Sequence, residues 1–147
     1  MDSKTAKLIY QSMIAPIFTY CPLALYGSIP PYLKSKINSL ESRAQSIIGS
    51  EMIASSETIS KKRLCVFVHK SLHTKQFEDH FVDYFKYKKT KVNTRDNGTK
   101  VAMPRIKLEI ARKSAFYQGA KLFNSLPREF RSKKDLDSFK NSLDEFS

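Results

Sequence analysis

Apolar residues recur at helical spacing through the first third of the chain, and this pattern restricts the fold more than any other feature. Between residues 31 and 48 they alternate at intervals of four and three: Leu33, Ile37, Leu40, Ala44 and Ile47. One face of an α-helix has that period. Residues 4–20 show similar spacing, but Pro16 removes a backbone donor and clashes with the preceding turn, so we expect a kink. The two stripes are predicted to pack together as a helical hairpin.

Further helices are predicted downstream, at residues 60–72, 76–85 and 134–145. The helix predicted over residues 76–85 has a phenylalanine at every fourth position, Phe77, Phe81 and Phe85, so that all three lie on one face. We expect these residues to belong to the core rather than to bind bases. Residues 114–125 are expected to combine a short extended piece with a short helix.

A change of pattern after residue 86 indicates β-structure. Asn97-Gly98 lies between extended-looking segments, and this dipeptide favours a tight hairpin turn. Residues 91–95 and 100–103 are therefore predicted to form a two-stranded ribbon. The predicted fold class is mainly α: a helical hairpin plus further helices and one small β-ribbon.

Positive charge is concentrated in the middle of the chain. The sequence has 26 Lys and Arg against 14 Asp and Glu, a formal net charge of +12. Residues 1–60 hold five basic and four acidic residues, whereas residues 86–113 hold ten basic and two acidic ones. Such an excess points to a polyanion or an anionic membrane surface as partner, and we favour nucleic acid.

Aromatic residues accompany the charges of residues 86–113, namely Phe85, Tyr87, Phe116 and Tyr117. Basic side chains neutralise phosphates, and aromatic rings stack on unpaired bases. The predicted role is contact with the phosphate backbone rather than reading of bases. The residues predicted to make it are Lys88, Lys89, Lys91, Arg95, Lys100, Arg105, Lys107, Arg112 and Lys113.

Several protein classes are excluded. Two cysteines cannot build a disulfide scaffold, and no apolar run approaches the roughly 20 residues that cross a bilayer. The first residues show no signal-peptide core. We therefore expect an intracellular protein without a membrane partner, with nucleus and cytoplasm both left open.

Cys65, His69 and His73 are spaced at i, i+4 and i+8 on a predicted helix. Such a row presents three possible zinc ligands, but ligands in a straight line do not close a tetrahedron. A core cysteine and two interfacial histidines are the simpler interpretation. We expect no metal and no cofactor, and the chain has no glycine-rich phosphate-binding motif.

The stretch Arg112–Pro127 reads RKSAFYQGAKLFNSLP and resembles the C-terminal signature of reverse transcriptases from non-LTR retrotransposons, the jockey-like elements of the LINE type. Three more pieces are similar to that family and follow its order: residues 10–21 with Arg43-Ala44, then Thr94-Arg95 with Met103-Pro104-Arg105, and finally Ser138-Phe139-Lys140. Phe123 stands where the family usually has Trp, and Thr74 where it has Gly.

The resemblance implies the thumb and post-thumb region of an RNA-directed DNA polymerase. It divides the chain into a thumb-like helical unit (1–50), a helical connector (51–92) and a C-terminal module with the ribbon and the terminal helix (93–147). The hairpin of the predicted fold would then be thumb-like.

Catalysis is not expected. A polymerase needs carboxylates that hold two metal ions, and the family carries them in an Asp-Asp turn that this sequence lacks. Phe77-Glu78-Asp79-His80 is the nearest look-alike and lies in a helical pattern. The first hypothesis is therefore a non-catalytic fragment of a transposable-element reverse transcriptase that binds RNA or an RNA–DNA template–primer duplex.

A second hypothesis needs no nucleic acid. The chain would be a helical protein-interaction module that associates with itself or docks on an intact polymerase, because stripes that once faced a palm domain would remain exposed. A translated relic without a role is the third possibility.

Overall fold

The computed structural model describes residues 2–20, 27–49, 54–74, 80–81, 83–89 and 98–145. Its described elements, in chain order, are α1 (Ser3–Ile9), the π-helical turn η1 (Tyr10–Ile14), α2 (Ala15–Thr19), α4 (Pro31–Ile48), α5 (Ser56–His73), α7 (Glu109–Arg112), α8 (Ala115–Ser125), α9 (Arg128–Arg131) and α10 (Leu136–Glu145). The mainly α prediction is confirmed.

The predicted irregularity at Pro16 takes the form of the π-helical turn η1. The backbone N–H of Ala15 donates to the carbonyl of Tyr10, five residues earlier, so the turn is one residue wider than an α-turn. Pro16 follows in the first turn of α2, where a residue without an N–H is tolerated. The wide turn thus adapts α1 to a proline that would otherwise break the helix.

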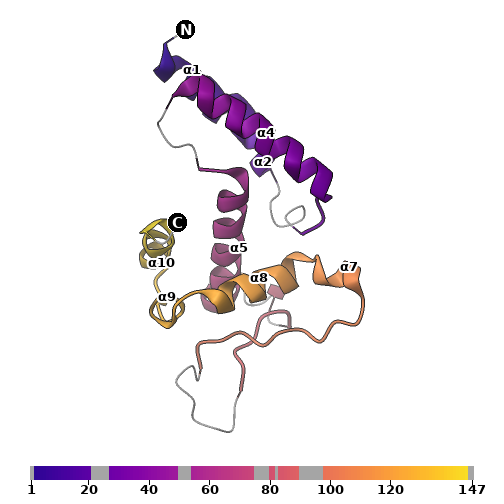
Figure 1. Ribbon diagram of the computed structural model, residues 1–147. Coiled ribbons are helices and arrows are strands. Elements are labelled where there is room, and N and C mark those ends of the chain that lie inside the picture. The colour runs from indigo at the N-terminus through magenta and orange to yellow at the C-terminus, as the bar shows by residue number, and fades with distance from the viewer. Residues whose placement is uncertain are drawn as a thin grey trace.

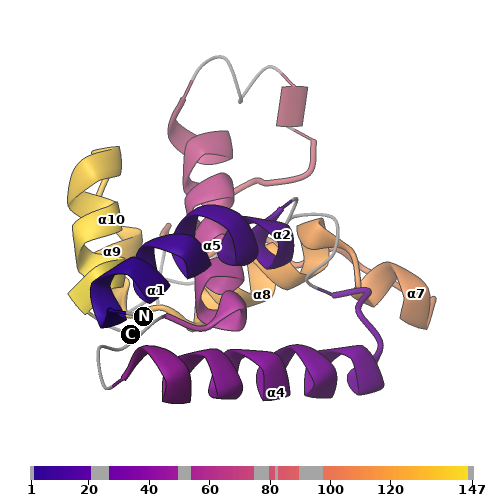
Figure 2. The same ribbon diagram turned by 90° about the horizontal axis from the view of Figure 1, so that it is seen from above.

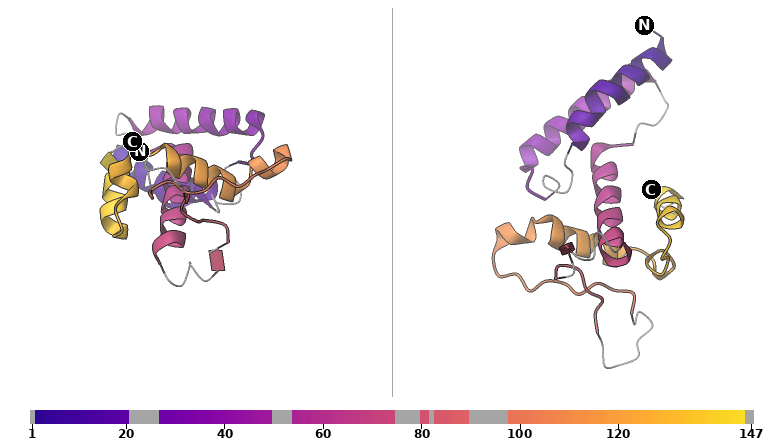
Figure 3. Two further views of the ribbon diagram at one scale, coloured as in Figure 1. Left: turned by 90° about the horizontal axis from the view of Figure 1, so that it is seen from below. Right: turned by 180° about the vertical axis from the view of Figure 1, so that it is seen from behind.

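Helix α4 runs back alongside α1 and α2, as Figures 1 and 3 show, and forms the predicted hairpin with them. A small buried cluster joins the two sides: Ala6, Tyr10 and Ile48, with Ala15 and Ala44 packed against it. Gly49 ends α4 with φ 94°, a conformation that glycine adopts without steric cost.

Helix α5 leads away from the hairpin and carries one side of the main core (Figure 1). It begins earlier than predicted because Ser55 caps it: the Ser55 hydroxyl accepts from the N–H of Thr58 at 3.2 Å. The Glu41 carboxylate of α4 accepts from the N–H of Ser56 at 2.8 Å. These bonds satisfy donors that a helix start leaves free.

Helices α8 and α10 pack on different sides of α5 (Figure 2). Gly119 permits the close crossing of α8, because a Cβ atom there would lie 3.0 Å from Cγ2 of Val68. The core cluster between these helices comprises Cys65, Val68, Phe85, Val101, Ala120, Phe123, Leu126, Phe139 and Leu143.

The prediction for residues 114–125 is wrong in its extended piece. Helix α8 is continuous because Ser114 caps it, accepting a hydrogen bond from the N–H of Tyr117 at 3.3 Å. The short helices α7 and α9 were not predicted. The terminal helix is confirmed: Asp135 accepts from the N–H of Ser138 at 2.8 Å near its start, and Phe139 and Leu143 are buried.

The predicted β-ribbon is wrong: the described residues contain no strand, only an isolated antiparallel bridge between Tyr87 and Val101. The partner of the second predicted strand is therefore residues 86–88, and the first predicted strand, residues 91–95, lies wholly outside the described part of the chain. On its other side Val101 bonds to a side chain rather than to a strand, and Pro104 has no N–H to donate. Backbone pairing among the described residues of this region is therefore confined to the bridge between Tyr87 and Val101.

Half of the predicted helix over residues 76–85 falls outside the described residues, which include 80–81 as helix and 83–84 as a turn. Phe85 lies beyond that turn, with its N–H donating to the carbonyl of Phe81 at 3.2 Å. Its side chain is buried in the core, as predicted.

Candidate nucleic-acid interface

The basic segment, residues 86–113, lies across the C-terminal half of the molecule. The structure describes this segment in two parts, residues 86–89 and 98–113, and antiparallel hydrogen bonds join them. The N–H of Lys88 donates to the carbonyl of Lys100, and the N–H of Ala102 donates to the carbonyl of Lys86, both at 2.8 Å. From there the chain runs without regular structure beneath α8 to α7 (Figure 1).

Most of the predicted phosphate-contacting residues reach solvent. The six exposed ones are Lys88, Lys89, Arg105, Lys107, Arg112 and Lys113, and Lys100 is half-buried. Lys91 and Arg95 lie outside the described residues. The structure therefore distributes these cations along the whole segment, from the bridge at Tyr87 to the start of α8, rather than gathering them at one point.

Most of the exposed cations in the predicted set are not ion-paired with another described residue. Four lysines outside the set do face carboxylates: Lys61 with Glu57, Lys62 with Asp144, Lys86 with Asp83 and Lys140 with Asp137, at 2.8 to 3.2 Å. Within the set, Arg112 pairs with Glu109 at 3.4 Å. No ion pair between described residues involves the side chains of Lys88, Lys89, Arg105, Lys107 or Lys113, which leaves their charge available to an anion.

The Asn124 side chain anchors the middle of the segment to helix α8. Its Oδ1 accepts from the N–H of Val101, and its Nδ2 donates to the Val101 carbonyl, each at 2.8 Å. The Val101 side chain is 1% exposed. This part of the basic segment is thus held in the core while its neighbours remain at the surface.

The far end of the segment is fixed by backbone contacts. The side-chain amide of Gln118 donates to the carbonyl of Arg112 at 2.7 Å. Gly27 lies so close to Lys113 that a Cβ atom there would come within 1.9 Å of the Lys113 carbonyl oxygen. The backbone that carries both cations is therefore positioned by α8 and by the loop before α4.

Two of the aromatic residues near the charges do not offer an open ring to a base. Phe85 is buried at 3% exposure, and Tyr87 is half-buried with its hydroxyl 2.9 Å from Nε2 of His73. Burial raises the pKa of Tyr87, so its hydroxyl stays protonated. The accessible ring is Tyr84, at 53% exposure, which the sequence did not single out.

The Cys65, His69 and His73 row serves packing in the structure. Cys65 is a core residue, as predicted, and burial raises the pKa of its thiol to about 12. Nε2 of His69 lies 2.8 Å from the carbonyl oxygen of Lys133, and the imidazole stacks on Phe139 with centroids 4.3 Å apart. In the part of the chain that the structure describes, no three His, Cys, Asp or Glu side chains are grouped to hold a metal ion.

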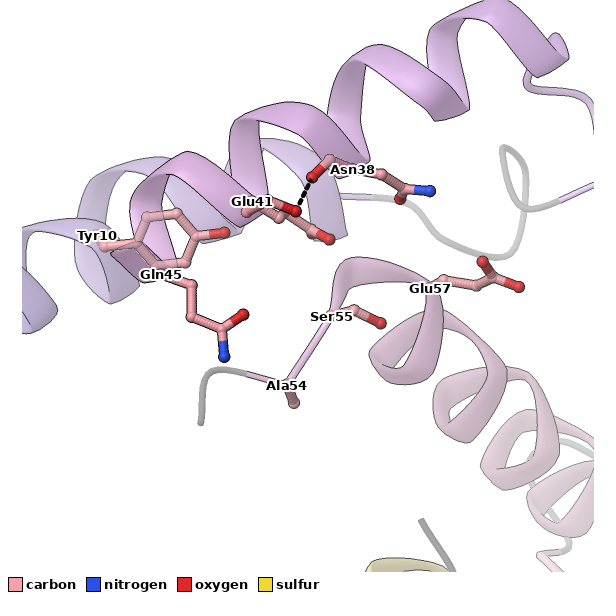
Figure 4. Close-up of a pocket in the computed structure, with 8 residues that line it drawn as sticks. Tyr10, Asn38, Glu41, Gln45, Ala54, Ser55 and Glu57 are labelled. Carbon is pink, nitrogen blue, oxygen red and sulfur yellow. Dashed lines mark hydrogen bonds between the residues drawn. The ribbon is translucent and has the colours of Figure 1, made fainter. Parts of the chain in front are cut away.

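A polar cavity of about 290 Å³ lies between α4 and the start of α5 (Figure 4). Its carboxylates already have partners: Glu41 accepts from Ser56, and a hydrogen bond from Lys61 lowers the pKa of Glu57. The negative charge of this lining makes it unsuitable for phosphate, so the basic segment remains the candidate interface.

Comparisons of the chain with known protein families, with curated proteins and with solved structures found no match. Within the described residues, no helix combines the length and the apolar character needed to traverse a bilayer.

Proposed function

We propose that this protein binds nucleic acid through the phosphate contacts of its basic segment and has no catalytic role of its own. The observation that carries the proposal is the charge arrangement: exposed Lys88, Lys89, Arg105, Lys107 and Lys113 form no ion pair with another described residue, whereas Lys61, Lys62 and Lys140 elsewhere pair with carboxylates. Phosphates can replace water around such cations without first breaking an ion pair.

The resemblance to the thumb and post-thumb region of non-LTR reverse transcriptases gives the proposal its biological form. The protein would be a fragment of a transposable-element RNA-directed DNA polymerase, and its partner a template–primer duplex or the element's RNA. A thumb-like hairpin of α1, α2 and α4 beside a basic post-thumb region is the arrangement that this proposal requires.

The experiment is a titration of a labelled RNA–DNA duplex with the protein over a range of salt concentrations. If about four to six phosphates are engaged, log Kd should change with log salt at a slope of roughly 4 to 5 in magnitude. Weak dependence on duplex sequence is expected as well, because phosphates carry no sequence information. Affinity that ignores salt would refute the proposal.

A second candidate function rests on the exposed apolar side chains of the hairpin. Leu8, Met13, Ile17 and Ile47 are each between 66% and 72% exposed, and the cluster inside the hairpin is small. Exposed apolar surface of this kind marks interaction sites. Residues 1–60 carry almost balanced charge, so two copies of this unit can approach without strong repulsion.

Size-exclusion chromatography with mass detection at low and high salt distinguishes the candidates. Self-association through apolar side chains persists or strengthens in salt, whereas co-elution with nucleic acid is lost. Ile17→Lys should abolish self-association and leave nucleic-acid binding intact. A monomer at all concentrations would remove the second candidate.

A further inference from the structure

We infer that Tyr84 is a stacking platform for an unpaired base, which makes single-stranded nucleic acid a ligand of the basic segment. This inference rests on the proposed nucleic-acid binding, and it specifies that the bound nucleic acid contains unpaired bases. It is argued from the stack of Tyr84 on Phe116 and from the cations that lie close to these two residues along the chain.

The Tyr84 ring packs against two phenylalanines and still leaves about half of the residue accessible. It stacks on Phe116 with ring centroids 4.2 Å apart and an interplanar angle of 14°, and Phe81 lies at an angle to it with centroids 6.3 Å apart, yet 53% of the residue is accessible. Phe116 therefore covers one face, and we take the opposite face as the surface on which a base would stack.

Phe116 is itself held by the aromatic cluster under it. Its centroid lies 5.8 Å from that of the buried Phe85 and 6.5 Å from that of Phe67 on α5. Backbone bonds position Tyr84 as well, since its N–H donates to the carbonyl of Phe81 at 2.9 Å. The platform is accordingly preorganised, and a base that stacks on it need not order the ring.

Cations of the basic segment lie close to both residues along the chain. Lys113 and Arg112 precede Phe116 by three and four residues, and their backbone is fixed by Gly27 and Gln118. Lys88 follows Tyr84 by four residues, at most about 14 Å of chain. Asp83, the acidic residue next to Tyr84 in the sequence, is paired with Lys86 at 3.0 Å.

Proteins bind unpaired strands by combining aromatic rings with phosphate-binding cations. Bases within a duplex are already stacked on one another and do not offer a face to the ring. The platform therefore adds affinity for single strands, while the cations serve single strands and duplexes alike.

The sequence contains no tryptophan, so Tyr84→Trp introduces a sole indole that reports directly on stacking. The probes are an oligothymidine of about 12 nucleotides and a duplex of equal length, at about 50 mM salt. We expect quenching of the indole by the single strand and little by the duplex. Tyr32→Trp is the control, because Tyr32 is 63% exposed on the hairpin and should respond to neither.

Tyr84→Leu provides the affinity measurement, since it retains an apolar cover over Phe116 but has no π-face. The Kd for the oligothymidine should rise about five- to one-hundred-fold, while the Kd for the duplex stays within about two-fold. If Tyr84→Leu impairs folding, affinity for both probes falls together, and the Tyr84→Trp signal then decides.

The outcomes separate this inference from the proposed function. Salt-sensitive binding of both probes, without quenching of Tyr84→Trp and without an effect of Tyr84→Leu, overturns the platform and leaves phosphate binding intact. Absence of binding to either probe overturns both proposals.

Discussion

The side-chain amide of Asn124 hydrogen-bonds both backbone groups of Val101, each at 2.8 Å. Because the amide both accepts from and donates to the Val101 backbone, it pairs with Val101 as one residue of a neighbouring strand would. They connect the basic segment to helix α8, and α8 in turn packs on α5. This half-buried amide is therefore one of the contacts that position the candidate interface.

Replacing Asn124 with Leu is expected to lower the free energy of unfolding by about 2–3 kcal/mol. Leu keeps the volume but leaves the N–H and the carbonyl of the buried Val101 without partners, and such groups are costly in a protein interior. Urea denaturation followed by circular dichroism measures the change. Asn141→Leu is the control, because Asn141 is exposed on α10; equal midpoints for the two variants would contradict this role of Asn124.

Gly119→Ala should destabilise the protein, and the same change should stabilise a Val68→Ala background. In the wild type the new methyl group lies 3.0 Å from Cγ2 of Val68, and overpacking of a full core costs about 1–3 kcal/mol. Removing that contact leaves the gain of about 0.5–1 kcal/mol from replacing glycine within a helix. Thermal unfolding of the four proteins in the cycle checks this. An unchanged sign in both backgrounds would show that α8 does not approach α5 so closely.

Stability should fall as the pH drops below about 6.5, and His69 should contribute to that fall. Burial lowers the pKa of His69, opposed by its bond to the Lys133 carbonyl and by Asp135. Nε2 must carry the hydrogen of that bond, since a carbonyl only accepts, and Nδ1 is buried without a hydrogen-bond partner among the described atoms. A proton added at Nδ1 would be left unsatisfied in the core.

The unfolded chain therefore binds this proton more readily than the folded one. Stability conferred by neutral His69 is complete above the unfolded pKa of 6.5 and is lost as the pH falls from there toward the lower folded pKa. Urea unfolding between pH 7.5 and pH 5 should be less pH-dependent in His69→Gln than in the wild type. His80→Gln, at an exposed position, should keep the wild-type dependence; equal slopes in all three proteins would refute the assignment.

The purified chain should not extend a primer in the presence of template, Mg²⁺ and nucleotides. The sequence contains no adjacent aspartate pair of the kind that holds the two metal ions of a polymerase in this family. Incorporation of labelled nucleotide is the measurement. Activity that co-purifies with the chain and is abolished by Asp79→Asn would contradict the non-catalytic interpretation.

The sequence predicted the positions of helices correctly where a local pattern of residues determines them. The four-three spacing from Leu33 to Ile47 predicted α4 with its full length, and Gly49 predicted its end. Pro16 predicted an irregularity, which takes the form of the π-helical turn over Tyr10–Ile14. Ser114 was missed as a helix cap, although a serine three residues before a backbone donor is a local signal.

The errors concern contacts between distant residues. Nothing in the sequence around Val101 indicates that the Asn124 amide, 23 residues later, will bind its backbone, or that Tyr87 rather than residues 91–95 will form the antiparallel bridge with Val101. Tyr84 was overlooked for the same reason. Its exposure and its stack on Phe116 depend on where α8 begins and on how it crosses α5, which no periodicity encodes.

The most direct test of nucleic-acid binding through the basic segment compares the salt dependence of two triple variants. Lys88, Lys89 and Arg105 changed to Ala remove exposed cations within the segment, and Lys4, Lys36 and Lys134 changed to Ala remove the same number outside it. Duplex affinity of each variant is measured over a range of salt concentrations. We predict that the first set lowers the magnitude of the log–log slope by up to about 3, while the second leaves it nearly unchanged. Equal slopes for the two variants would contradict the assignment of binding to residues 86–113.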